Sequence, residues 1–129
     1  NRERERPMTQ ADRLSNSVLT QFTGTGNWYR HALNRAVLFT DGAKHVADAG
    51  GAYWLLDEIA LAQRYEQAVA AQPFQCWKLA VNPDHTGNLV CEDGNGNAVY
   101  RKALDYTDFP AAGVTLWVTD NTILLPSEY

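Results

Sequence analysis

The sequence predicts an α+β domain in which an antiparallel β-meander of about four to six strands packs against two or three helices. The 129 residues are enough for one domain with a sizeable core, so folding requires neither a metal nor a disulfide. In the first half of the chain, apolar residues recur at helical spacing. From Phe74 onward the spacing changes to two, and Gly, Asn and Asp cluster between the apolar runs, which indicates strands joined by turns.

The N-terminal segment divides into a leader and the start of the domain. Residues 1–8 are expected to form a disordered leader, because alternating Arg and Glu side chains offer nothing to bury and Pro7 interrupts a helix. Residues 9–129 are expected to form a single domain. Thr9 has the pattern of an N-cap, with Asp12 three residues later, and predicts a helix over 10–21.

The next elements are a hairpin and two helices. Segments 28–31 and 36–40 are rich in aromatic and β-branched residues, which predicts a short hairpin. Thr40 or Asp41 then caps a short helix. The main helix, 52–70, is apolar on several sides, and this favours packing between layers of the domain.

The second half of the chain is expected to form the meander. Its strands are predicted over 74–81, 89–92, 98–106, 114–119 and 122–125. The last of them is apolar and is expected near the end of the sheet, where an exposed edge must be covered or paired. We therefore expect the chain to form a homodimer, since two-fold pairing is the commonest solution.

Charge excludes some classes of protein and leaves two interpretations open. The net charge of −4 and pI of about 5.2 argue against a basic nucleic-acid or membrane binder. No apolar run reaches the length of a membrane span, and no signal peptide is visible, so we expect a cytoplasmic protein. Residues 84–129 carry seven acids against Arg101 and Lys102, a balance of 2 − 7 = −5. This excess predicts either a solvated hairpin face or an acidic surface for a basic partner.

The motifs of familiar chemistries are missing from the sequence. The expected turn places Cys91 opposite about Leu79, out of register with Cys76, so we expect two reduced thiols. The oxygen spacing of 93–97 resembles the start of a calcium loop, but the later glycine and acid are missing, which favours a hairpin turn. We therefore predict no catalytic residue, metal or cofactor, and the sequence leans away from an enzyme without deciding the matter.

Aromatic residues supply the candidate binding site. Residues 28–31 alternate between two strand faces, and Tyr53 and Trp54 follow two glycines at a helix start with free backbone N–H groups. One interpretation is a pocket for a planar or anionic ligand, with candidate binding residues Trp28, Tyr29, Arg30, His31, Tyr53, Trp54 and Asp57. The other is ordinary packing of amphipathic aromatics, with Arg30 paired to an acid such as Asp57.

Several separate motifs carry a resemblance to a known family. They occupy residues 22–25, 28–31, 40–42, 50–57, 74, 77–79, 91–96, 107–110 and 124–129. In this order they resemble an uncharacterised bacterial family of unknown function over about residues 20–129. The resemblance implies a small accessory protein carried on mobile DNA, such as a plasmid, an integrative element or an integron cassette. Gly26 departs from the acidic residue expected there, and the leader lies outside the pattern.

These observations favour a non-enzymatic module that binds a macromolecular partner. The alternative is a small-ligand-binding protein or an unrecognised enzyme that uses an aromatic-lined pocket near Trp28, Arg30, Tyr53 and Trp54. A nucleic-acid partner bound through residues 22–46 is disfavoured by the low pI. A concave aromatic cavity would favour the small ligand, and a flat sheet face would favour the macromolecule.

Overall fold

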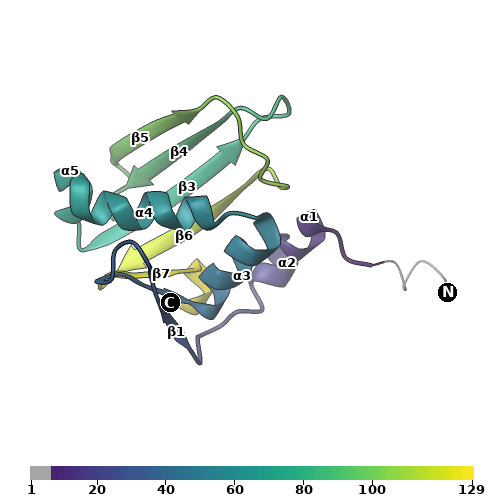
Figure 1. Cartoon of the computed structure of the whole chain (residues 1–129), viewed down its shortest axis with the longest axis horizontal. Coiled ribbons are helices and arrows are strands. Elements are labelled where there is room, and N and C mark those ends of the chain that lie inside the picture. The colour runs from purple at the N-terminus through teal and green to yellow at the C-terminus, as the bar shows by residue number, and fades with distance from the viewer. Residues whose placement is uncertain (1–6) are drawn as a thin grey trace.

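The protein is described by a computed structural model over residues 7–129, so the expected leader, residues 1–8, lies outside the described residues except for Pro7 and Met8. A seven-stranded sheet forms its centre, and α4 lies across one face of that sheet (Figure 1). The strands are β1 (Trp28–Arg30), β2 (Leu38–Thr40), β3 (Phe74–Val81), β4 (Gly87–Glu92), β5 (Ala98–Leu104), β6 (Gly113–Thr119) and β7 (Thr122–Leu124). The helices are α1 (Gln10–Arg13), α2 (Asn16–Leu19), α3 (Asp41–Gly50), α4 (Tyr53–Tyr65) and α5 (Gln67–Ala70), with a 3₁₀ turn η2 (Pro126–Glu128).

Capping interactions explain where two of the helices begin. Thr9 and Asp12 exchange backbone-to-side-chain hydrogen bonds of 3.0 Å at α1, which confirms the predicted capping box. Thr40 caps α3, because its hydroxyl accepts a hydrogen bond from the Ala43 N–H at 3.2 Å. Gly51 ends α3 in the left-handed conformation, at φ 59°, which glycine adopts without strain.

Both long predicted helices are shorter in the structure. The helix expected over 10–21 is divided into α1 and α2, because the backbone of Ser15 is extended and starts a new helix. The helix expected over 52–70 is divided in the same way at Glu66, with φ −112° and ψ 101°, into α4 and α5. Apolar spacing continues across each break, which is why the sequence predicted single helices.

The predicted antiparallel meander of four to six strands is wrong. The sheet is mixed and has the order β1-β2-β7-β6-β3-β4-β5. After β5 the chain passes β4 and β3 and adds β6 beside β3, so the central strand β3 pairs antiparallel with both β4 and β6. The N-terminal hairpin joins the same sheet, because β2 pairs in parallel with β7 through Leu38–Thr122 and Phe39–Ile123. The α+β content is confirmed.

The last strand is not an edge strand. β7 lies between β2 and β6, and the side chain of Ile123 is fully buried. The edges are β1 and β5 instead. The apolar character of 122–125 therefore reflects an internal position, and the edge argument for a homodimer no longer applies.

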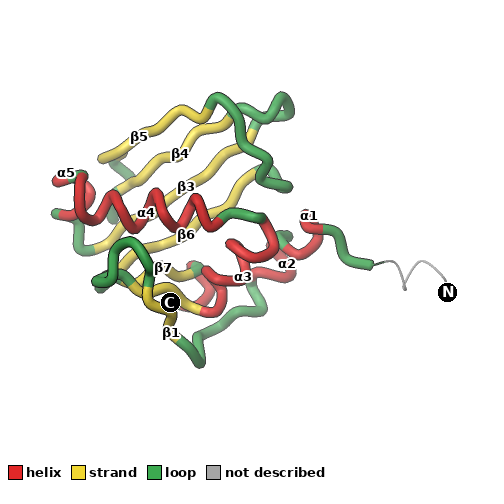
Figure 2. Tube along the Cα trace, viewed as in Figure 1, coloured by secondary structure: helices red, strands yellow, loops and turns green. Residues whose placement is uncertain are grey.

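The hydrophobic core lies between the sheet and the helices on one of its faces (Figure 2). Inward side chains alternate along the strands and meet the apolar side of α4. The buried set includes Trp77, Leu79, Leu89, Leu116, Leu55, Leu56 and Ile59. Within residues 7–129, no helix combines the length and apolar character needed to cross a bilayer.

The two cysteines lie on opposite faces of the sheet. Cys91 is paired in register with Trp77 and faces the core, whereas Cys76 is paired with Glu92 and faces away from it. Both thiols are free, as expected. The register itself differs from the predicted one by two residues, because Leu79 is paired with Leu89 and not with Cys91.

We expect Cys91 to resist a thiol reagent in the folded protein at about pH 8, and both thiols to react in denaturant without reductant. Burial raises the pKa of the Cys91 thiol from 9.0 to about 12. As pH rises from 9.0 toward 12, the unfolded state loses this proton and the folded state retains it, so the free energy of unfolding should fall. Reaction of Cys91 at the same rate with and without denaturant would contradict this.

Candidate functional site

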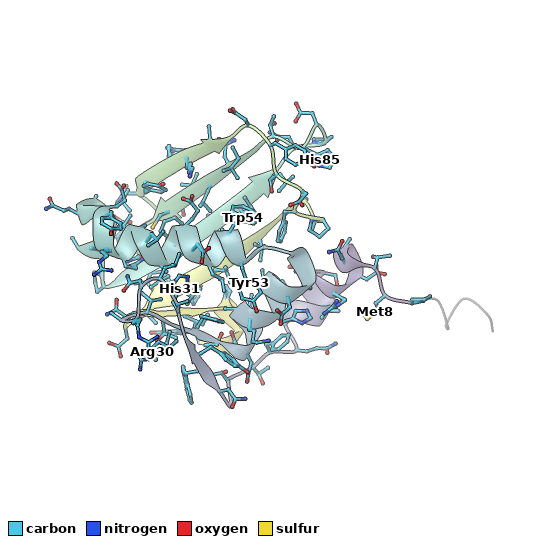
Figure 3. The ribbon with its side chains drawn as sticks, viewed as in Figure 1. Met8, Arg30, His31, Tyr53, Trp54 and His85 are labelled. Carbon is cyan, nitrogen blue, oxygen red and sulfur yellow. The ribbon has the colours of Figure 1, made fainter. Side chains whose placement is uncertain are left out.

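The edge strand β1 carries three of the predicted site residues. Trp28 is 58% exposed and Tyr29 is half-buried, which matches the expected alternation. Arg30 is exposed, and its guanidinium donates a hydrogen bond to the carbonyl of Arg35 in the loop after β1. Arg30 is labelled well away from Tyr53 and Trp54 in Figure 3. The Arg30 guanidinium therefore bonds to its own loop and does not line the first turn of α4.

Tyr29 and Tyr53 each donate a hydrogen bond to an aspartate of α3. The Tyr29 hydroxyl donates to Asp41 at 2.9 Å, which raises the pKa of Tyr29 and lowers that of Asp41. The Tyr53 hydroxyl donates to Asp48 at 2.6 Å, and Lys44 donates to the same carboxylate at 2.8 Å. Lys44 also lies 5.6 Å from the centroid of the Tyr29 ring. These contacts form a paired polar strip along the helix.

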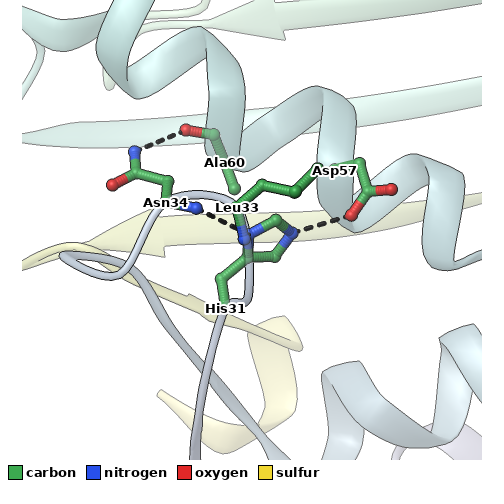
Figure 4. A network of polar contacts seen from close by, with 5 residues as sticks. All are labelled: His31, Leu33, Asn34, Asp57 and Ala60. Atoms are coloured by element: carbon green, nitrogen blue, oxygen red, sulfur yellow. Dashed lines mark hydrogen bonds and ion pairs between the residues drawn. The ribbon is translucent and has the colours of Figure 1, made fainter.

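His31 and Asp57 form the one direct contact between two of the predicted residues (Figure 4). The His31 ring is 4% exposed, and its Nε2 lies 2.8 Å from the carboxylate of Asp57. Nδ1 accepts hydrogen bonds from the backbone N–H groups of Leu33 and Asn34, both at 3.1 Å. This fixes the tautomer with hydrogen on Nε2. Nδ1 therefore holds the loop after β1 in its own conformation, and Nε2 attaches that loop to α4.

Asn34 completes this attachment. Its amide donates to the carbonyl of Ala60 in α4 at 2.8 Å, and its side-chain oxygen accepts from the Ala36 N–H at 3.2 Å. A His–Asp pair resembles the base and orienting group of a hydrolase, but such a base needs a free nitrogen within reach of a nucleophile. Here the second nitrogen faces two backbone donors. The pair fits a structural role.

Trp54 lies on a different side of α4 from Tyr53 (Figure 3). It lines a hollow of about 230 Å³ together with residues of the loop after β5. The other lining residues are Leu104, Tyr106, Thr107 and Asp108. The predicted site is therefore divided into an edge strand, a polar strip on α3, a buried imidazole paired with a partly exposed Asp57, and this separate hollow.

The N-terminus of α3 is held by residues far away in the sequence. The carboxylate of Glu128 accepts hydrogen bonds from the Thr40 hydroxyl at 2.7 Å, the Gly42 N–H at 3.0 Å and the Leu125 N–H at 2.8 Å. The Asp41 N–H donates to the hydroxyl of Thr25 at 2.9 Å. Acceptors within the chain thus occupy the donors that an external anion would use.

This role of Glu128 was not found from the sequence. The signal that could have indicated it is Gly42 next to a Thr-Asp cap. A β-carbon at Gly42 would lie 2.4 Å from the Glu128 carboxylate and 2.7 Å from Leu125. The missing side chain of Gly42 therefore leaves the space that the Glu128 carboxylate of the C-terminal segment occupies. Three motifs quoted for the resemblance, 22–25, 40–42 and 124–129, meet at this point.

The sheet face that points away from α4, here called the open face, carries an aromatic row. Phe74 and Trp117 are in edge contact with centroids 5.0 Å apart, and Trp117 and Tyr129 are in edge contact at 5.6 Å. Tyr129 is 78% exposed. The strand register places Thr115, Lys78, Val90 and Arg101 side by side as the row next to the one that contains Trp117. The sequence analysis placed Phe74 and Trp117 in predicted strands and assigned no binding role to them or to Tyr129.

A groove lies beside the aromatic row. It has a volume of about 580 Å³, and Lys78, Ala80 and Thr115 of the open face line one part of it. The apolar part of its lining comes from α2, the segment before it, the strands and the start of η2: Leu14, Leu19, Leu79, Val114, Leu125 and Pro126. The open face thus combines two partly exposed aromatic side chains, the exposed Tyr129 and an apolar depression.

The acidic residues of 84–129 do not gather on one face. Asp84 and Asp93 accept hydrogen bonds from residues of their own turns. Glu92 pairs with a lysine of β3 at 3.1 Å, and Glu128 holds α3. The acids in exposed loops are Asp105, Asp108 and Asp120. Among residues 7–129, no group of three or more His, Cys, Asp and Glu side chains is arranged to hold a metal ion.

Comparison with known proteins gives one match. The sequence model described as "Family of unknown function (DUF6876)" matches residues 13–129. No curated protein matches the chain. No solved structure matches it either. The match covers every helix and strand described above except the first three residues of α1.

Proposed function

We propose that the chain, which belongs to the DUF6876 family of unknown function, is a non-enzymatic binding module for a protein partner. The partner binds the open face. The proposal includes two expectations. A cytoplasmic location is supported by the lack of a long apolar run in the sequence, and an origin in bacterial mobile DNA is supported by the motif resemblance alone.

The observation that carries the proposal is the aromatic row beside the apolar groove. A sheet face exposed to water normally carries polar side chains at alternate positions. Here Phe74, Trp117 and Tyr129 stand at or beside those positions, next to about 580 Å³ of apolar depression. Aromatic side chains in such a patch supply most of the energy of protein–protein binding. Exposed apolar patches of this kind mark interaction sites.

The charges of the open face indicate the chemistry of the partner. Arg101 is exposed and, among residues 7–129, has no carboxylate partner. Lys78 lies in the same row and is paired with Glu92. A partner segment with apolar side chains for the groove and an acidic residue for Arg101 would complement this face.

The environments of His31 and of the two cysteines support a non-catalytic role. Both nitrogens of His31 are engaged, as described above. Burial raises the pKa of both thiols, Cys76 and Cys91, so neither is activated as a nucleophile at neutral pH.

A random peptide library displayed on phage tests this function. Panning on the immobilised protein should enrich apolar peptides that contain Asp or Glu, and Arg101→Glu and Tyr129→Ala should each weaken an enriched peptide about tenfold or more. Tyr65→Ala is the matched control, because Tyr65 is also exposed but lies at the end of α4, which covers the opposite face of the sheet. Absence of enrichment, or peptides that bind all variants equally, would contradict the proposal. Preferential binding of a single-stranded RNA oligonucleotide to the open face would replace it with a nucleic-acid function.

A further inference from the structure

The hollow beside Trp54 has the form of a small, preorganised binding site. Trp54 comes from the first turn of α4, whereas Tyr106 and Asp108 come from the loop after β5. Leu104 and Thr107 supply the rest of the lining. At about 230 Å³ the hollow is smaller than a pocket for a whole drug-sized ligand, so it suits a single head group.

The loop that carries Tyr106 and Asp108 is fixed from within. Thr107, which lies between them, is buried; its N–H donates to the His85 carbonyl at 2.7 Å, and its hydroxyl accepts from the Phe109 N–H at 3.2 Å. Phe109 is 2% exposed and packs against Gly50, where a β-carbon would lie 2.7 Å from its ring. Tyr106 and Asp108 are therefore held at the surface on either side of an anchored residue.

The charge of the hollow is negative. Asp108 is exposed, and among the described residues its carboxylate has no hydrogen-bond or ion-pair partner. The cation on the neighbouring part of β5, Lys102, is bound to Glu58 of α4 at 2.6 Å and so does not neutralise Asp108. Asp105 adds a second exposed carboxylate in the same loop.

Two aromatic rings and an unpaired carboxylate around an apolar hollow have a definite ligand chemistry. The face of an aromatic ring attracts a cation, and Trp and Tyr rings are the side chains that surround quaternary ammonium groups. Tyr106 is 68% exposed, and its ring is in contact with that of His85, with centroids 5.8 Å apart. The methyl groups of such a cation would contact Leu104 and Thr107, and its charge would face Asp108.

We propose that this hollow binds a trimethylammonium head group, from a free quaternary amine or from a trimethylated lysine side chain. A trimethylammonium group fits better than an unmodified lysine, because the indole of Trp54, the ring of Tyr106 and the side chain of Leu104 offer apolar contact to its methyl groups. The site is separate from the open face, so it goes beyond the function proposed above.

Calorimetric titration of the whole chain with choline, and with its uncharged isostere 3,3-dimethylbutanol, tests the proposal. Choline should bind at least about tenfold more tightly than the isostere, because only the cation gains the ring and carboxylate interactions. Tyr106→Ala and Asp108→Asn should each weaken choline about fivefold or more. Tyr106→Phe, which keeps the ring, and Tyr129→Ala on the open face should leave the affinity unchanged.

Two further arms distinguish the sources of the head group. A trimethyllysine peptide that binds more tightly than choline, and more tightly than its unmethylated form, would assign the site to a modified protein; the reverse order would assign it to a free quaternary amine. Equal binding of choline and the isostere, no choline binding at millimolar concentration, or unchanged affinity in both Tyr106→Ala and Asp108→Asn would overturn the proposal. Tyr106 and Asp108 are exposed, so these variants should fold as the parent does.

Discussion

Replacing Glu128 with alanine should lower the free energy of unfolding by about 3 kcal/mol, because three hydrogen bonds to one carboxylate are lost together. The Thr40 hydroxyl and the N–H of Gly42 would be left at a buried helix N-terminus without their acceptor. The favourable charge at the positive end of the α3 dipole would be lost as well.

Denaturant titration followed by circular dichroism measures this effect, and two variants calibrate it. Glu128→Gln retains one acceptor oxygen and should fall between the parent and Glu128→Ala. Glu92→Ala removes a partly exposed ion pair with Lys78 and should change the free energy of unfolding by less than about 1 kcal/mol. If Glu128→Ala changed stability no more than Glu92→Ala, the carboxylate would not be holding α3 in solution.

Features set by neighbouring residues could be predicted from the sequence. The capping box of Thr9 and Asp12 needs only four consecutive residues, and the strand over 74–81 is visible in its own alternation. The hairpin of β1 and β2 was recognised for the same reason. Where a local signal continued across a break, as at Ser15 and Glu66, the prediction gave one helix in place of two.

Features set by distant residues could not be predicted. The apolar sequence of β7 is compatible with two positions, a sheet edge that another surface covers and the interior of the sheet. Only the parallel pairing of β7 with β2, a strand far away in the sequence, shows that the position is internal. The same limit applies to the site. The alternation of Trp28 and Tyr29 was predicted, but the partners Asp41 of Tyr29 and Asp57 of His31 depend on how α3 and α4 pack against that hairpin.

The contact between His31 and the loop after β1 leads to the second large effect. His31→Ala should lower the free energy of unfolding by about 3 kcal/mol, because it leaves a cavity and removes the acceptor of two backbone N–H groups. The carboxylate of Asp57 is partly exposed and regains water, so its loss of a partner contributes little.

Two conservative variants separate the contributions of the two ring nitrogens. In His31→Asn the side-chain oxygen takes the place of Nδ1, so the backbone donors of Leu33 and Asn34 keep an acceptor and the loss should be only about 1 kcal/mol. In His31→Gln the amide reaches toward Asp57 in the place of Nε2, the backbone donors lose their acceptor, and the loss should approach that of alanine. Chemical denaturation of the three variants gives the order directly. If His31→Gln lowered the free energy of unfolding less than His31→Asn, the bond to Asp57 would be the main contribution of the ring to stability. Nδ1 would then be free to accept a proton, and His31 would again be a candidate catalytic base.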